Sequence, residues 1–230
     1  MSKTGTLYIV ATPIGNLEDV TLRALRILKE VDAVLAEDTR VTKKLLSHYQ
    51  IDTKIVRFDA LMETKLTDEA VRRLSARESL ALVTDAGTPG VSDPGARLVK
   101  AAREVGIHIE AIPGASSLTT ALSISGLSAD EFLFLGFLPH KKGRQTLLKR
   151  IAEYDGTVVL FESTHRIVKL LGELAEYATE RTVVLARELT KMHEEVLTGT
   201  PAELTALLTS QSVKQKGEFV VIVAHTPIET

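Results

Sequence analysis

A glycine- and proline-rich stretch at residues 84–95, Thr-Asp-Ala-Gly-Thr-Pro-Gly-Val-Ser-Asp-Pro-Gly, constrains the fold of this chain more than any other feature. The apolar run 80–83 before it is typical of a buried strand, and residues 97–103 after it predict an amphipathic helix. Glycine and proline shape the backbone of such a loop rather than leaving it flexible. Because open α/β sheets bind ligands beyond the carboxyl ends of their strands, the stretch predicts an α/β sheet with a ligand-binding loop at that edge.

The rest of the first half alternates apolar and amphipathic runs. Strands are expected at residues 7–11, 33–36, 54–58, 80–83 and 107–112. Helices are expected between them at residues 21–31, 42–49, 67–77 and 97–103, the first with Leu22, Leu25, Ile27 and Leu28 on its apolar face. This alternation predicts a mainly parallel sheet with helices on both faces.

A helix of small residues at 115–125, ending at Gly126, marks the expected boundary between two α/β domains, residues 1–125 and 126–230. The second domain repeats the alternation. Its strands are expected at 131–138, 157–161, 182–186 and 219–224, and its helices at 143–154, 165–177 and 201–208. No internal repeat or low-complexity linker is visible, so we expect the two halves to be packed together.

Composition excludes several classes of protein. The chain has 230 residues, of which 44% are hydrophobic, and a net charge of −2, which provides no global field for attracting nucleic acid. It has no cysteine, which excludes disulfides and thiolate metal sites and fits a reducing cytosol. The scattered histidines suggest no metal cluster, and neither a membrane span nor a signal peptide is visible. We expect a cytoplasmic protein.

Three turns are expected at the same edge of the first sheet. They are residues 11–17, 84–95 and 113–117, and each follows a predicted strand. Each alone fits an ordinary turn between a strand and a helix, but together they outline one crevice. Ser116 and Ser117 would stand at a helix N-terminus, where backbone N–H groups point outward.

The 84–95 loop is neither a P-loop nor a Gly-x-Gly-x-x-Gly dinucleotide turn. Asp93 followed by Pro94 predicts a helix N-cap with proline at the first helical position. Asp85 has two interpretations, because it could contact a ligand or accept a hydrogen bond from the backbone of its own turn.

Charged residues follow two strands of the second half. They are Glu162, His165 and Arg166 after residues 157–161, and Arg187, Glu188 and Lys191 after residues 182–186. They could face a cleft between the domains, or they could form structural ion pairs at the strand ends.

Residues 132–152 contain no acidic side chain, and they hold His140, Lys141, Lys142, Arg144, Lys149 and Arg150. Such a patch can neutralise nucleic-acid phosphates. The alternative, which the residues alone favour, is a solvated loop and helix face.

Five motifs in order resemble a known family. They are Leu-Tyr-Ile-Val-Ala-Thr-Pro-Ile-Gly-Asn-Leu at 7–17, Ala-Glu-Asp-Thr-Arg at 36–40, the stretch 84–95, Pro-Gly-Ala-Ser-Ser at 113–117 and Phe-Glu-Ser-Thr-His-Arg at 161–166. The chain resembles the small-subunit ribosomal RNA cytidine 2′-O-methyltransferases of the tetrapyrrole-methylase-like superfamily. The resemblance implies two α/β domains, S-adenosylmethionine in the cleft between them, and a homodimer. The turn at 11–17 lacks the Gly-x-Gly of the tetrapyrrole enzymes, which points to the RNA branch.

The resemblance also implies the cofactor contacts. In the superfamily a Gly-Asp-Pro-type loop touches the cofactor, and here Thr88 replaces its aspartate while Asp85 lies nearby. The cofactor residues implied are Thr12, Pro13, Ile14, Asp85, Gly87, Thr88, Pro89, Val91, Ser116, Ser117, Phe161 and Ala186.

The implied reaction is an in-line methyl transfer from a sulfonium to a ribose 2′-hydroxyl of ribosomal RNA or of an assembled small subunit. The candidates for the base that accepts the hydroxyl proton are Glu162, His165 and Glu188. The candidate RNA contacts are Lys141, Lys142, Arg144, Arg166, Arg187 and Lys191. The alternatives are methylation of a tetrapyrrole or a protein on the same fold, and a non-catalytic RNA-binding module.

Overall fold

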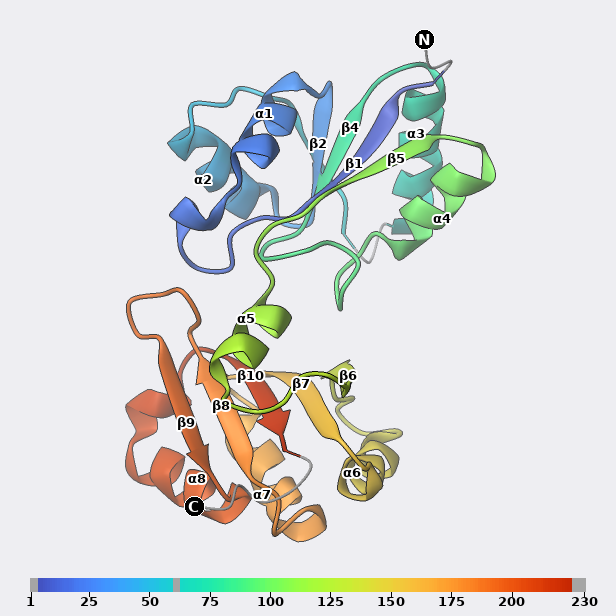
Figure 1. Cartoon of the computed structure of the whole chain (residues 1–230). Coiled ribbons are helices and arrows are strands. Elements are labelled where there is room, and N and C mark those ends of the chain that lie inside the picture. Colours follow the sequence, from blue (N-terminus) through green and yellow to red (C-terminus); the bar gives the residue numbers. More distant parts are fainter. Residues whose placement is uncertain (1–3, 60–62, 225–230) are drawn as a thin grey trace. The chain divides into compact units, whose positions relative to one another are not determined.

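The computed structural model describes residues 4–59 and 63–224, and the chain divides into two compact units, Met1–Ser116 and Ser117–Thr230 (Figure 1). The predicted α/β class is confirmed in both units. Each has its own five-stranded sheet. In the described part of the chain, no helix is long and apolar enough to cross a membrane.

The N-terminal unit is built on a parallel sheet with strand order β3-β2-β4-β1-β5. Its strands are β1 (Thr6–Val10), β2 (Ala33–Ala36), β3 (Ile55–Arg57), β4 (Leu80–Val83) and β5 (His108–Ile112). The central strands β2 and β4 are buried along their whole length, as expected for a parallel sheet covered on both faces. The prediction of a parallel sheet is confirmed here.

Helices cover both faces of this sheet. Its helices are α1 (Leu22–Glu30), α2 (Thr39–His48), α3 (Glu63–Ser75) and α4 (Ala96–Glu104), and a 3-10 turn, η1 (Leu17–Asp19), precedes α1. Side chains alternate along β4, so Ala81 and Val83 pack with α1 and α2. Leu80 and Leu82 pack with α3 and α4 on the opposite face.

Two local predictions in this unit are wrong. Leu22 is 86% exposed and lies outside the buried face of α1, because the helix begins there, with Thr21 as its N-cap. Asp93 does not cap α4. The residue before that helix is Gly95, whose φ of 132° favours glycine and which carries no side chain to cap with.

The C-terminal unit has a mixed sheet with strand order β6-β7-β10-β8-β9. Its strands are β6 (Phe132–Phe137), β7 (Thr157–Ser163), β8 (Val183–Arg187), β9 (Glu195–Gly199) and β10 (Glu218–Val223). Strands β6 and β7 run parallel, whereas β10 runs antiparallel to both of its neighbours. Strand β9 is not among the predicted strands, because this edge strand has no apolar run and none of its residues is fully buried.

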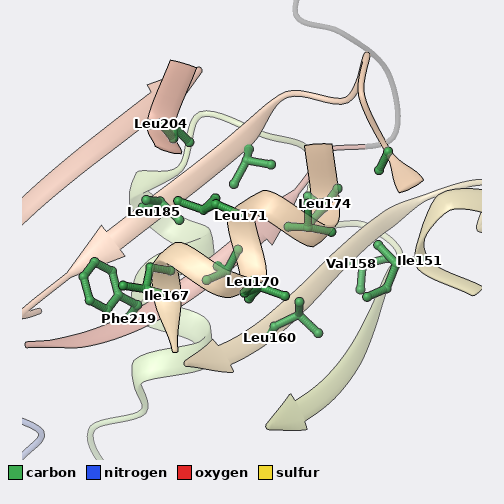
Figure 2. Packing of buried hydrophobic residues seen from close by; sticks show 14 of the residues in the cluster. Ile151, Val158, Leu160, Ile167, Leu170, Leu171, Leu174, Leu185, Leu204 and Phe219 are labelled. Atoms are coloured by element: carbon green, nitrogen blue, oxygen red, sulfur yellow. The ribbon is translucent and has the colours of Figure 1, made fainter. Parts of the chain in front are cut away.

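Leucine, isoleucine and valine side chains form one core on a single face of this sheet, as Figure 2 shows. The helices of the unit are α5 (Ser117–Ile124), α6 (Arg144–Glu153), α7 (Ile167–Tyr177) and α8 (Pro201–Ser210), followed by the 3-10 turn η2 (Ser212–Gln215). Helix α7 supplies Ile167, Leu170, Leu171 and Leu174 to the core and packs against both α6 and α8.

Helix α5 packs against β10 and buries Ala121 and Leu122, so it belongs to the C-terminal unit. The predicted boundary at residues 125–126 therefore differs from the structural division between Ser116 and Ser117. A helix of small residues carries no signal of which sheet it covers.

Candidate functional site

The three predicted turns of the N-terminal unit are joined by hydrogen bonds. Thr12 and Gly87 exchange two backbone hydrogen bonds of 2.9 and 3.0 Å, which link the turns 11–17 and 84–95. The Thr88 hydroxyl donates to the carbonyl of Ala115 over 3.3 Å and links the second turn to the third. The turns lie at one edge of the sheet, as the sequence predicted.

Glycine permits the close approach of these turns. Gly87 has a φ of +83°, and a Cβ there would lie 3.4 Å from Ile14 Cγ2. A Cβ on Gly114 would lie 3.1 Å from the Cβ of Ala11. Gly90 also has a φ of +83°, but its Cβ position faces open space, so this part of the loop exposes its backbone.

Asp85 fastens the 84–95 loop to another loop. Its Oδ1 accepts a hydrogen bond of 2.9 Å from the backbone N–H of Asp38, which follows β2. Asp38 in turn caps α2, accepting from the backbone N–H of Arg40 over 2.8 Å. Asp85 therefore bonds the backbone of a neighbouring loop rather than that of its own turn.

Two carboxyl groups at this edge of the sheet, those of Asp93 and Glu37, have raised pKa values. Burial raises the pKa of Asp93 to about 6, the charge of Asp85 adds to the effect, and the neighbouring Thr84 hydroxyl opposes it. Burial and the charges of Asp85 and Asp93 likewise raise the pKa of Glu37. Among the described residues, no three His, Cys, Asp or Glu side chains are grouped so as to hold a metal ion.

In the C-terminal unit, one row of residues crosses the whole sheet in register. It comprises Phe137, Phe161, Val220, Ala186 and Val196, one from each strand. Phe161 and Ala186, the cofactor contacts that the resemblance implies in this half, therefore share one sheet face and flank Val220. Neighbouring Leu160 and Leu185 point to the core on the other face.

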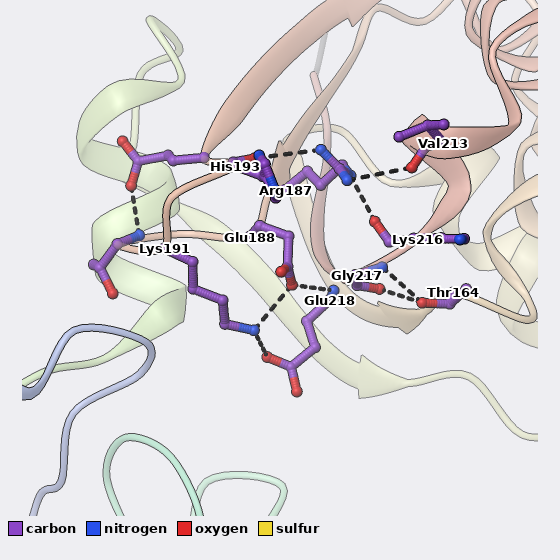
Figure 3. A network of polar contacts seen from close by, with 11 residues as sticks. Thr164, Arg187, Glu188, Lys191, His193, Val213, Lys216, Gly217 and Glu218 are labelled. Carbon is purple, nitrogen blue, oxygen red and sulfur yellow. Dashed lines mark hydrogen bonds and ion pairs between the residues drawn. The ribbon is translucent and has the colours of Figure 1, made fainter.

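Glu188 and Lys191 form a polar network with the start of β10 (Figure 3). Lys191 Nζ lies 2.9 Å from both Glu188 Oε1 and Glu218 Oε2, and the N–H of Glu218 donates to Glu188 Oε1 over 3.0 Å. Thr164 Oγ1 donates to the Gly217 carbonyl and accepts from its N–H, each over 2.8 Å. The prediction of ion pairs at the strand ends is confirmed for these residues.

This network makes Glu188 a weak base. Burial alone would raise the pKa of Glu188, but hydrogen bonds from Lys191 and the Glu218 N–H, together with the charges of Lys191 and Arg187, lower it. A carboxylate with a lowered pKa accepts a proton less readily.

Arg187 does not present its guanidinium to solvent. It is 7% exposed and donates to the carbonyls of Lys216, His193 and Val213 over 2.6, 3.3 and 3.4 Å. It also lies 3.6 Å from Glu195. The Arg187 side chain holds loops of its own unit together, and its role as an RNA contact stays a prediction.

Arg144 and Arg166 also form ion pairs and hydrogen bonds with groups of their own unit. Arg144 is 4% exposed, forms a bidentate ion pair with Glu173, and donates to the Pro139 carbonyl over 3.2 Å. Arg166 Nε lies 3.3 Å from Glu162, and its guanidinium donates to the Leu138 carbonyl. Both arginines are held by protein partners, and their roles as RNA contacts stay predictions.

The three candidates for the base differ in how far their side chains are exposed to solvent. The side chain of Glu162 is fully buried, and its Oε1 accepts from the Ser163 N–H over 2.9 Å and pairs with Arg166. Glu188 lies in the network described above, whereas His165 is exposed. Lys141 and Lys142 are exposed as well, as are His140, Lys149 and Arg150.

Phe137 is not among the predicted site residues, yet it is 52% exposed and packs edge-on against Phe161 with ring centroids 5.6 Å apart. A phenylalanine within an apolar run is expected to be buried in a strand, so the sequence does not indicate that this one is exposed.

Comparison with known proteins agrees with this fold. Residues 6–205 match the model of the Tetrapyrrole (Corrin/Porphyrin) Methylases. Among solved structures, diphthine synthase has a TM-score of 0.75 at 17% identity, covering 96% of this chain and 90% of that one. Uroporphyrin-III C-methyl transferase from Thermus thermophilus, complexed with S-adenyl homocysteine, has a TM-score of 0.67 at 20% identity, covering 96% and 97%. These likenesses show the fold.

Several curated relatives are far more similar in sequence. The ribosomal RNA small subunit methyltransferase I of Xylella fastidiosa is 48% identical over 97% of this chain and 82% of that protein. The protein of the same name from Borrelia garinii is 44% identical over 96% of this chain and 99% of its own length. The chain therefore belongs to the tetrapyrrole methylase family and, within it, to the ribosomal RNA small subunit methyltransferase I group.

Proposed function

We propose that this protein transfers a methyl group from S-adenosylmethionine to a ribose 2′-hydroxyl of a cytidine in small-subunit ribosomal RNA. The observation that carries the proposal is the 48% identity to a ribosomal RNA small subunit methyltransferase I over nearly the whole chain. The three hydrogen-bonded turns support it, because they expose shaped backbone at the edge where α/β sheets bind ligands.

S-adenosylmethionine fits the residues of the three turns. Gly90 leaves the backbone of its loop open to a ligand, and Ser117 begins α5. We assign the cofactor to the residues that the resemblance implies, which are Thr12, Pro13, Ile14, Asp85, Gly87, Thr88, Pro89, Val91, Ser116 and Ser117 of the turns, with Phe161 and Ala186 of the C-terminal sheet. When bound, the cofactor supplies a methyl group already activated by its sulfonium charge.

The chain's own task is then to hold the 2′-hydroxyl in line and to accept its proton. Of the three candidates, His165 fits this task best, because its imidazole is exposed, whereas Glu162 is buried and Glu188 has a lowered pKa. Glu162 acts through Arg166 as a positioning residue. Lys141 and Lys142 hold RNA phosphates.

We further propose that the enzyme works as a homodimer in the cytoplasm, where its ribosomal substrate is made. The family resemblance supports the dimer.

Methyl transfer from labelled S-adenosylmethionine tests the function. Small ribosomal subunits lacking the modification, and the RNA extracted from them, are incubated with the protein, and the RNA is then hydrolysed in alkali. We expect label at a linkage that resists alkali, because a 2′-O-methyl group blocks cleavage there. His165→Gln is expected to lower the methylation rate while calorimetry shows unchanged cofactor binding.

Other results would contradict the proposal. Label in a tetrapyrrole or in ribosomal protein, with none in RNA, would favour the other methylation reactions of this fold. RNA binding without any cofactor binding would indicate a non-catalytic module.

A further inference from the structure

Phe137 stands out among the exposed side chains of the C-terminal unit. It ends the edge strand β6, and its 52% exposure is unusual for a phenylalanine within a strand. It is held in place, since its ring packs edge-on against Phe161, which packs in the same manner against Phe134 at 4.9 Å.

A bulge in β6 produces this arrangement. Strand alternation would place Phe134 and Phe137 on opposite faces of the sheet, because they are three residues apart. The pairing with β7 shifts register between Phe134 and Gly136, where Gly136 has a φ of +60°. The extra residue turns Phe137 to the face that bears Phe134 and Phe161.

Two arginines, the buried Arg144 and the half-buried Arg166, hold the backbone that follows Phe137. Arg166 donates to the carbonyl of Leu138, and Arg144 donates to the carbonyl of Pro139. Glu162 and Glu173 in turn pair with these arginines. The exposed ring is therefore part of a preorganised surface rather than of a loose loop.

The same short segment then becomes basic. His140, Lys141 and Lys142 are all exposed, and residues 132–152 hold no acidic side chain. An exposed aromatic ring beside exposed lysines is the combination with which proteins bind single-stranded nucleic acid, because bases stack on the ring while the lysines neutralise phosphates.

We infer that Phe137 is a stacking platform for a base of the substrate RNA, next to the transferred methyl group. The second part rests on the proposed function, in which Phe161, the in-register neighbour of Phe137, contacts the cofactor. The platform accounts for the bulge, for the ring packing and for the two arginines that fasten residues 138–139.

Three substitutions test the platform by RNA affinity. Phe137→Leu keeps an apolar side chain without a ring and is expected to bind unmodified small-subunit RNA roughly 5- to 100-fold more weakly. Phe137→Tyr is expected to bind within about twofold of the parent protein, since its ring stacks equally well. Val105→Ala, at a residue that is 55% exposed after α4 in the other unit, is the control and should not change affinity.

A fluorescence measurement reports on stacking itself. The chain has no tryptophan, so Phe137→Trp introduces a single reporter. Its emission is expected to be quenched when unmodified small-subunit RNA is added, whereas the emission of Val105→Trp is expected to stay constant.

The inference is overturned if Phe137→Leu binds RNA as tightly as the parent, or if Phe137→Trp emission does not respond to unmodified small-subunit RNA. It is also overturned if Phe137→Leu loses affinity only because its oligomeric state changes. These results are distinct from failure of the proposed function, in which the parent protein itself would not methylate the RNA.

Discussion

Arg144 and Glu173 form a bidentate ion pair, with the Arg144 Nε 3.0 and 2.9 Å from the two carboxylate oxygens. The arginine side chain is 5% exposed and the glutamate side chain 22%. The pair joins α6 to α7 and leaves Arg144 free to hold the Pro139 carbonyl. A basic residue that the sequence suggests for RNA binding therefore has a structural task.

Arg144→Lys should destabilise the protein. Lysine keeps the charge but cannot form the planar bidentate contact, so the pair and the Pro139 bond are weakened. We expect the free energy of unfolding to fall by about 1–3 kcal/mol in urea denaturation. Arg150→Lys, at an exposed position of the same helix, is the control. Unchanged stability together with weaker RNA binding would instead make Arg144 an RNA contact.

Lys141→Ala combined with Lys142→Ala should reduce both RNA affinity and its dependence on salt. Each phosphate contact to single-stranded nucleic acid contributes about 0.7 to the slope of log K against log salt, so the double variant should lose about 1.4. Filter binding over a range of KCl concentrations measures this slope. Lys29→Ala with Lys100→Ala removes two exposed lysines of the N-terminal unit and should leave the slope unchanged. An unaltered slope in the Lys141 and Lys142 variant would exclude these lysines as phosphate contacts.

Asp93→Asn should stabilise the protein at neutral pH. The pKa of Asp93 is raised from 3.8 to about 6, so folding disfavours its ionised form and its contribution to stability falls as the pH rises from about 4 to about 6. The shift corresponds to at most about 3 kcal/mol, and screening of a partly buried carboxylate reduces this to about 1–2 kcal/mol. The advantage of the variant should therefore be small at pH 4 and complete by pH 7 in urea denaturation.

Asp68→Asn, at an exposed position of α3, provides the matched control. If Asp93→Asn has the same effect on stability at pH 4 and at pH 7, the carboxylate is not destabilised by its surroundings.

Arg181→Met should lower the denaturant concentration at which the C-terminal unit unfolds. The Arg181 guanidinium is buried and donates to the carbonyls of Ile151, Tyr154, Gly156, Val223 and Ala224. Methionine fills similar space without donors, so carbonyls at the end of α6 and of β10 lose their partners. We expect a loss of about 3 kcal/mol from several unsatisfied groups. Arg150→Met is the exposed control, and equal stability of the two variants would contradict this role.

Much of the fold follows from local patterns. Strand β2 lies at residues 33–36 and β4 at 80–83, as predicted, because both are short apolar runs flanked by polar segments. The alternating order of strands and helices predicts the parallel N-terminal sheet. Strand β9 and the boundary before α5 were not predictable, because an exposed edge strand and a helix of small residues acquire their places only through their neighbours.

The turns show what the sequence by itself determined. Glycine and proline restrict their own backbone, so residues 11–17, 84–95 and 113–117 could be identified as shaped loops at the carboxyl ends of strands. The hydrogen bonds between Thr12 and Gly87 then follow from a parallel sheet that places those ends side by side.

Only the tertiary structure decided which partners the charged side chains contact and which aromatic side chains are exposed. Arg144, Arg166 and Arg187 look like ligands for phosphate in the sequence. Groups that are distant in the chain engage all three, namely the Glu173 carboxylate and the carbonyls of Leu138 and Lys216. Phe137 looks like core, yet a bulge exposes it. A side chain's partners depend on which segments meet in space. The local sequence around a long flexible arginine, or around an aromatic ring at a strand end, therefore does not predict those partners.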